Sequence, residues 1–437
     1  MFKNILKNIL FLLNVGFIFL TEYSIYFVYG DYSTFVDRLS LRLSSINILY
    51  VKVFQAFALN NSLIDDTINN KLLKFTDNAP WDYSDICFDD LSSVAEKYDL
   101  LLESDYDTPI NSGMISLVFK MKKRSNKNEI VIVKMKRKNI QQKLDDAIDN
   151  LLFSMYILSF IPIINKYQLS EVVAKNVEII RHQTNFLEEV DNMYLIRENC
   201  KNLKYIKIPT ANRQVTEEYP NIILMEFIMG LKINQVSNED YDGFAKQIVK
   251  FGLVTTIVHG VTHGDLHSGN VLFIKDISDQ KYPHKIGVID FGIIYNIDNQ
   301  YKGLLFEVLT NMLDMPARES AEKILNSGII EPKGILKQIP KEIYDNILNF
   351  TEEVIHETIY ESKKANQIQI YKFLSKLKEC LSKKELTNIG IRLSDNFVKS
   401  QLVLAMAHGI TLTLCKGDFI TLIDECLNEL FNTKLLF

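Results

Sequence analysis

The chain has 437 residues, of which 47% are hydrophobic and 24% are charged, and its formal net charge is −5. This length is ample for a large core and predicts two lobes or more. The basic residues are scattered, which argues against nucleic acid as a partner. Five cysteines lie far apart without a CxxC pair, an arrangement typical of reduced thiols in an intracellular protein.

Residues 1–35 form an apolar N-terminal segment. Lys3 and Lys7 precede an apolar run over residues 9–20, and on a helix both lysines fall on the polar side. Helices that lie on a membrane surface have this pattern. The uncharged run continues only to about Glu22, which is short for a membrane-spanning helix. A membrane-surface or anchor helix, a core helix of an N-terminal extension and a cleaved targeting peptide all remain open.

Residues 36–108 are expected to form a helical extension. A helix predicted over residues 43–59 is apolar nearly all round, so it is expected to be buried. Lys52 and Gln55 interrupt it three residues apart and share a face. A lysine on a buried helix needs a partner or a function, although one at the helix edge can reach solvent. Further helices are predicted over residues 62–75 and 87–102.

Residues 109–230 have the pattern of a β-rich nucleotide-binding lobe. The run from Pro109 predicts a strand, a turn at Ser112 and Gly113, and a second strand. A kinase places its glycine-rich phosphate cover at such a turn, but only one glycine is present here. The strand over residues 129–135 carries Lys134, as the VAIK strand of kinases does. Lys134 is therefore expected to reach the α- and β-phosphates of a nucleotide.

Helices are predicted next, around residues 141–160 and 170–192. The second is rich in acidic residues, and one glutamate is expected to pair with Lys134 and hold it in place. Glu189 is the preferred partner and Glu188 the alternative. Most acidic residues of such a helix simply face solvent.

Two strands are predicted to close this lobe, over residues 206–209 and 221–228. The second ends at Glu226, Phe227 and Ile228. Backbone groups there are expected to meet the adenine as a hinge between two lobes. A helical lobe is predicted over residues 231–437.

The most informative stretch reads His263-Gly-Asp-Leu-His-Ser-Gly-Asn270, followed by Asp290-Phe-Gly292. Apolar runs at residues 271–274 and 286–289 flank a polar segment, so they predict a β-hairpin. That hairpin would bring Asp265 and Asn270 close to Asp290.

This arrangement suits phosphoryl transfer. Asp265 is the expected base or orienting group for an attacking hydroxyl or water, and Asn270 and Asp290 are the expected Mg²⁺ ligands on a bound ATP. The alternative is that these residues only cap turns. No Ala-Pro-Glu follows the DFG, and Gly264 and His267 stand where protein kinases have Arg and Lys. Both features argue against a phospho-activated peptide kinase.

Taken together, these motifs resemble the UbiB/ADCK family of atypical, protein-kinase-like proteins tied to coenzyme Q biosynthesis. The loop HGDLHSGN is similar to the family's HGDLHPGN, with Ser268 in place of proline. Lys52-Val53-Phe54-Gln55 is similar to its KxGQ motif, with Phe54 in place of glycine. The resemblance implies an α+β bilobal protein-kinase-like fold with a small β-rich N-lobe carrying inserted helices, a helical C-lobe and an N-terminal helical extension.

The resemblance also implies ATP and Mg²⁺ as cofactors and a prenyl-lipid, ubiquinone-type pathway at a membrane surface. Lys52 and Gln55 would enter the nucleotide pocket and keep peptides out. Three features depart from the family pattern. The Ala-rich loop has lost its alanines and carries Gly113, the acidic ExD motif has become Gln183 and Asn185, and Phe54 replaces a glycine.

Two other functions are consistent with the sequence. One is a small-molecule kinase of the aminoglycoside or choline kinase type, which shares the catalytic-loop pattern but lacks the helix with Lys52. The other is a non-catalytic, nucleotide-gated scaffold, which the altered loop and amide pair favour. The sequence identifies neither the phosphoryl acceptor nor protein partners. Only the N-terminal segment suggests a lipid or membrane surface as a partner.

Overall fold

The computed structural model describes residues 2–58, 72, 75, 79–101, 108–158, 160, 177, 180–299, 302–303, 315–361 and scattered positions from 376 to 429. The chain divides into two compact units. Unit 1 contains Met1–Tyr194 and Pro209–Ile228, and unit 2 contains Leu195–Ile208 and Met229–Phe437. Residues 195–208, which the sequence analysis assigned to the nucleotide lobe, therefore lie in unit 2.

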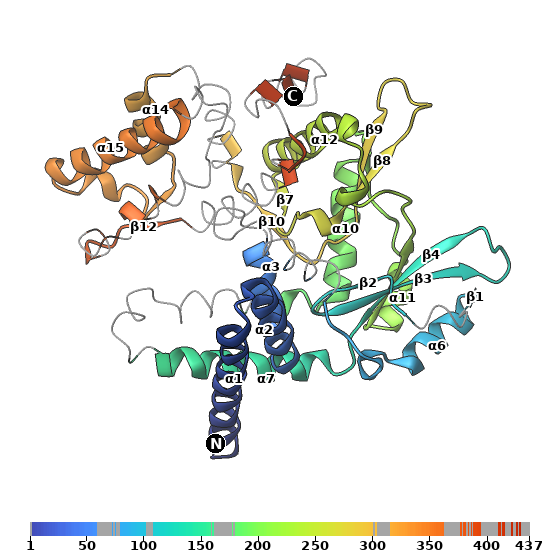
Figure 1. The fold of residues 1–437 in the computed structure, drawn as a ribbon. Coiled ribbons are helices and arrows are strands. Elements are labelled where there is room, and N and C mark those ends of the chain that lie inside the picture. The colour runs from blue at the N-terminus through green and yellow to red at the C-terminus, as the bar shows by residue number, and fades with distance from the viewer. Residues whose placement is uncertain are drawn as a thin grey trace. The chain divides into compact units, whose positions relative to one another are not determined.

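Unit 1 begins with a helical hairpin, in which α1 (Phe2–Tyr29) and α2 (Tyr32–Ile46) lie side by side (Figure 1). Glu22 of α1 is buried, and its carboxylate lies 2.7 Å from Arg38 and 2.7 Å from Arg42 of α2. Helix α1 continues past Glu22, where the sequence analysis ended the uncharged run, and the two guanidinium groups compensate the charge of the buried carboxylate. Ile5–Tyr29 is thus long and apolar enough to cross a membrane by length and composition, a test that signal sequences also pass.

The helix predicted over residues 43–59 is interrupted at Asn47. The side chain of Asn47 accepts a hydrogen bond from the backbone N–H of Leu49 at 2.9 Å, which starts α3 (Leu49–Ala58). The helix predicted over residues 87–102 ends early as α6 (Phe88–Lys97), because Leu100–Leu101 forms strand β1 against β3 (Ser116–Lys123). The predicted helix over residues 62–75 lies outside the described residues except for Leu72 and Phe75.

A five-stranded antiparallel sheet forms the centre of unit 1. Its order is β1, β3, β4 and β6, with β2 also paired to β3. Apolar side chains of β3, β4 and β6 pack with α6 in one core, and those of α3 and α7 (Ile140–Leu158) form a second. The bounds are β2 (Asn111–Ser112), β3 (Ser116–Lys123), β4 (Ile130–Lys136) and β6 (Ile222–Glu226).

The remaining helices that begin in unit 1 are α7, α10 and α11, together with the short 3-10 helix η1, and the last residues of α10, from Leu195, belong to unit 2. The helix predicted over residues 170–192 has a break, since His182 is helical and a turn follows at Gln183 and Thr184. Asn185 then accepts a hydrogen bond from the N–H of Glu188 at 3.3 Å, which favours a new helix start. The bounds are η1 (Tyr83–Asp85), α7 (Ile140–Leu158), α10 (Phe186–Asn199) and α11 (Arg213–Glu218).

Unit 2 contains the predicted hairpin, as β8 (Val271–Lys275) and β9 (His284–Val288). The two strands are antiparallel, with Val271 opposite Val288. Strand β5 (Ile206–Lys207) pairs in parallel with β9, which explains why residues 195–208 belong to this unit. A second small sheet pairs β7 (Val261–His263) with β10 (Ile294–Asn296).

The other elements of unit 2 are mainly helical, and α14 packs against α15 around one apolar core (Figure 1). A π-helix, η5, leads from α12 directly into β7. The helices are η3 (Ile233–Gln235), η4 (Asn238–Asp240), α12 (Tyr241–Leu253), η5 (Val254–His259), η6 (Ser268–Asn270), α14 (Ala317–Asn326), η7 (Ile335–Lys337), α15 (Lys341–Ile355) and η8 (His356–Tyr360). Strands β11 (Ile330–Glu331) and β12 (Arg392–Leu393) pair with each other.

Candidate active site

Unit 1 holds a buried ion pair between Lys134 of β4 and Glu189 in the first turn of α10. The distance from Lys134 Nζ to Glu189 Oε1 is 2.5 Å, and the two residues are only 6% and 2% exposed. Glu188, the alternative partner, is half-buried and contacts His182 and Asn185 instead. The carboxylate of Glu189 therefore fixes the ammonium group of Lys134 in a site from which water is largely excluded.

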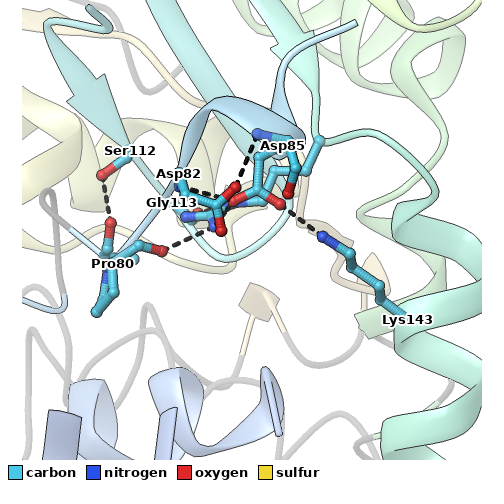
Figure 2. A network of polar contacts seen from close by, with 9 residues as sticks. Pro80, Asp82, Asp85, Ser112, Gly113 and Lys143 are labelled. Carbon is cyan, nitrogen blue, oxygen red and sulfur yellow. Dashed lines mark hydrogen bonds and ion pairs between the residues drawn. The ribbon is translucent and has the colours of Figure 1, made fainter. Parts of the chain in front are cut away.

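The turn after β2 is held by contacts to residues before and after it (Figure 2). The hydroxyl of Ser112 is buried and donates to the carbonyl of Ala79 at 2.6 Å, so it anchors the turn. The N–H of Gly113 donates to the carbonyl of Ser116 at 2.9 Å, and Arg137 donates to the Gly113 carbonyl at 2.7 and 3.0 Å. Phosphate binding by Ser112 and Gly113 stays a prediction.

The predicted hinge residues lie at the end of unit 1. Strand β6 ends at Glu226, whose N–H donates to the carbonyl of Thr210 at 2.9 Å. The ring of Phe227 lies 4.5 Å from Lys120 Nζ, and Ile228 is the last residue of unit 1 and is buried. Adenine binding by this segment remains a prediction.

The KxxQ motif lies on α3. Lys52 is half-buried, while the side chain of Gln55 is outside the described residues. Phe54 packs its ring 5.2 Å from that of Phe75, so the side chain that replaces the family's glycine fills the core of unit 1. Gln183, which replaces an acidic residue of the family pattern, is buried, and its Oε1 accepts no hydrogen bond from the described part of the chain.

In unit 2, His263 joins the loop that carries Asp265 to the segment that carries Asp290. Its Nδ1 accepts a hydrogen bond from the N–H of Asp265 at 3.1 Å, and its Nε2 contacts the backbone carbonyl of Asp290. A carbonyl only accepts, so a neutral imidazole protonated on Nε2 satisfies both contacts. The hairpin brings the same segments together, because the N–H of Ile289 donates to the carbonyl of Asn270 at 3.2 Å.

The metal-binding side chains predicted in unit 2 are oriented by the backbone. Asn270 Nδ2 donates to the carbonyl of Asp265 at 2.8 Å, which leaves its Oδ1 as an acceptor, and Asp290 Oδ1 accepts from the N–H of Gly292 at 3.0 Å. No three His, Cys, Asp or Glu side chains form a metal cluster among the described residues. Mg²⁺ is usually bound by one or two carboxylates together with phosphate oxygens, so these oxygen donors fit that ion.

Two features of this loop were missed by the sequence analysis. His263 was given no role, although it is the first residue of the HGD motif. Gly264 was noted only as a replacement for arginine. A Cβ at Gly264 would approach the side chains of Ile293 and Tyr295 to less than 3.0 Å, so the close packing of β10 requires glycine.

Burial lowers the pKa of His263 below its usual value of 6.5, although Asp290 and Asp265 act in the opposite direction. Below about pH 6.5 the unfolded chain binds a proton that the folded chain excludes, so the free energy of unfolding should fall as the pH falls. The expected slope is up to about 1.4 kcal/mol per pH unit. Urea unfolding between pH 5.5 and 7.5 measures this slope. If a His263→Asn variant showed the same slope, the pH dependence could not be assigned to His263.

Comparison with known proteins shows that the chain is similar to kinase-like proteins. Residues 82–324 match the family model described as an ABC1 atypical kinase-like domain. A Blochmanniella pennsylvanica protein named "Probable protein kinase UbiB" is 24% identical over 308 residues, which are 68% of this chain and 55% of that protein. The Arabidopsis thaliana protein named "Protein ACTIVITY OF BC1 COMPLEX KINASE 8, chloroplastic" is 21% identical over 317 residues, 70% of this chain and 40% of that protein.

Among solved structures, Rv3197 from Mycobacterium tuberculosis, solved in complex with erythromycin, is 14% identical with a TM-score of 0.46. The alignment covers 88% of this chain and 93% of that one. The chain spans about half the length of the curated relatives it matches.

Proposed function

Because the chain belongs to the ABC1 atypical kinase-like family, we propose that it is an ATP-binding, Mg²⁺-dependent atypical kinase or ATPase. The family match covers more than half of the chain, and the predicted α+β protein-kinase-like fold is confirmed by it. The observation that carries the proposal is the pair of contacts made by His263, which tie the Asp265 N–H and the Asp290 carbonyl to one imidazole. This arrangement fixes two carboxylate residues relative to each other, as phosphoryl transfer requires.

Each chemical task of the proposed reaction is assigned to named residues of this chain. Lys134, braced by Glu189, contacts the phosphates of ATP, and Asp265 orients or deprotonates the attacking group. Asn270 and Asp290 hold Mg²⁺, which neutralises charge on the phosphates when bound. The segment from Glu226 to Ile228 contacts the adenine, Ser112 and Gly113 form the phosphate cover, and Lys52 and Gln55 limit access by peptides.

The proposal is tested by thermal unfolding of the purified protein with ATP or ADP, with and without Mg²⁺. A ligand that binds only the folded state raises the free energy of unfolding, by about 2.7 kcal/mol when its concentration is a hundred times the dissociation constant. The melting temperature rises as a result. We expect a Mg²⁺-dependent rise in the wild type that is lost in Asp290→Asn and retained in Asp242→Asn, an exposed control in the same unit. An equal Mg²⁺-dependent rise in Asp290→Asn would refute the metal assignment.

The setting proposed for this activity is a membrane surface, in support of a prenyl-lipid pathway. Resemblance to the UbiB/ADCK family supports the pathway. The surface of α1 is the evidence for a membrane setting, because its large apolar side chains are exposed, among them Leu13 at 65% and Phe17 at 64%. A contiguous exposed apolar face is typical of a contact with lipid or protein.

Flotation of the protein with phospholipid vesicles measures this association. Replacing Leu13 and Phe17 by serine should weaken vesicle binding by about tenfold or more, because burying one such side chain contributes about 1.5–3 kcal/mol. Tyr83→Ser is the matched control, since Tyr83 is 59% exposed but lies in η1. Vesicle binding unaffected by the α1 substitutions would exclude α1 as the membrane contact.

A further inference from the structure

The sheet face of unit 1 that carries Lys134 also carries a second lysine, Lys136. The two residues are two positions apart on β4, so their side chains project from the same face of the sheet. The alternate residues of this strand face the other way and pack with α6 in the core; they are Val131, Val133 and Met135. Both ammonium groups therefore extend from the face opposite to that core.

The side chain of Lys136 is half-buried, and its ammonium group forms no ion pair with any residue that the structure describes. Lys136 Nζ lies 5.0 Å from the centre of the Phe186 ring, and Lys134 Nζ lies 5.7 Å from the same ring. An aromatic face attracts a cation but does not neutralise its charge. A charge that is partly removed from water without a counter-ion is unfavourable, so the position of Lys136 needs a functional reason.

The nearest source of negative charge is already used by the other lysine. Glu189 lies 2.5 Å from Lys134 Nζ. Burial lowers the pKa of Lys136 and Glu189 acts in the opposite direction, so the carboxylate influences Lys136 without forming an ion pair with it. The polar residues just before α10, Gln183 and Asn185, are uncharged amides. The positive charge of Lys136 is therefore left for an anionic ligand to neutralise.

The register of β4 with β6 shows where along the sheet this charge lies. Glu226, the first residue of the proposed adenine-binding segment, is opposite Val131 near the start of β4. Lys134 comes later on the strand, and Lys136 lies about 7 Å beyond it, at about 3.3 Å per residue. A nucleotide with its base at Glu226 and its inner phosphates at Lys134 would therefore extend its last phosphate towards Lys136.

We propose that Lys136 binds the terminal phosphate of ATP and makes the site selective for a nucleoside triphosphate over a diphosphate. This inference rests on the proposed function, in which Lys134 contacts the inner phosphates. The terminal phosphate supplies the negative charge that Lys136 lacks, and hydrogen bonds between an ammonium group and phosphate oxygens are short and strong. ADP has no such phosphate, so its binding does not use Lys136.

Isothermal titration of the full-length protein in Mg²⁺ buffer tests this selectivity. The ligands are ADP and the β,γ-imido analogue of ATP, which keeps the terminal phosphate and is not hydrolysed. We expect the wild type to bind the triphosphate analogue at least about tenfold more tightly than ADP. Lys136→Met should weaken binding of the analogue by at least about tenfold and leave ADP affinity within about twofold. Lys136→Arg, which keeps the charge, should retain the preference.

Lys138→Met is the matched control, because it makes the same change at an exposed lysine in the turn after β4, and both affinities should stay unchanged. Equal affinity of the wild type for the two nucleotides would overturn the inference, and that comparison needs no variant. So would an equal loss of both affinities in Lys136→Met, which would mean that Lys136 only supports the structure. In both cases the proposed function would stand. Absence of binding by either nucleotide would instead refute the proposed function and the inference with it.

Discussion

Replacing Asp265 by asparagine is expected to lower ATP turnover by about 10²–10⁴-fold and to leave ATP affinity within about twofold. The reason is chemical, since an amide cannot accept the proton or orient the attacking group as a carboxylate does. The substitution preserves the contacts of Asp265 to His263 and Asn270, because these use its backbone N–H and carbonyl, and it keeps a side-chain oxygen for the 3.9 Å contact with His267. The loss should therefore appear in kcat rather than in binding.

Phosphate release from ATP under saturating Mg²⁺ measures turnover, and thermal unfolding with ATP measures binding in the same samples. Asp242→Asn serves as the control, because it makes the same chemical change at an exposed position of α12. Wild-type turnover in Asp265→Asn would rule out Asp265 as the catalytic group. Loss of ATP binding in that variant would instead show that Asp265 contributes mainly to the ground-state complex.

Replacing Asp85 by alanine is expected to destabilise unit 1 by about 3–5 kcal/mol. Asp85 lies in a buried network with Arg137 at 2.9 Å and Lys143 at 2.6 Å, and the side chains of Arg137 and Asp85 are 6% and 7% exposed. Arg137 also donates hydrogen bonds to the carbonyl groups of Pro80 and Gly113 (Figure 2). Removing the carboxylate leaves a buried guanidinium group without its counter-ion.

Urea unfolding followed by Trp81 emission measures this effect, because Trp81 lies close to Asp85 in the sequence and in unit 1. We expect the melting temperature to fall by roughly 10 °C as well. Asp145→Ala is the matched control, since it breaks an exposed ion pair with Arg181 that is expected to contribute about 0–1 kcal/mol. If the double variant Asp85→Leu, Arg137→Met were as unstable as Asp85→Ala, unpaired charge would not be the cause.

The sequence by itself predicted the elements that depend on local pattern. The alternation of apolar residues and the polar segment between them predicted the β8–β9 hairpin, and with it the closeness of Asn270 and Asp290. The lysine at the end of an apolar strand predicted the position of Lys134, and acidic residues on the next helix limited its partner to Glu188 or Glu189. These features depend on periodicity and turn residues, which act over a few positions of the chain.

Only the tertiary structure decided the features that join residues far apart. Glu22 is neutralised by arginines 16 and 20 positions later and Arg137 by a carboxylate 52 positions earlier. The Asp290 carbonyl accepts a hydrogen bond from an imidazole 27 positions earlier. Strand β5 joins unit 2 because its partner is β9, on the far side of α12 in the sequence. Such partners are chosen by burial, since a charged or polar group removed from water requires whichever complementary group the folded chain places beside it.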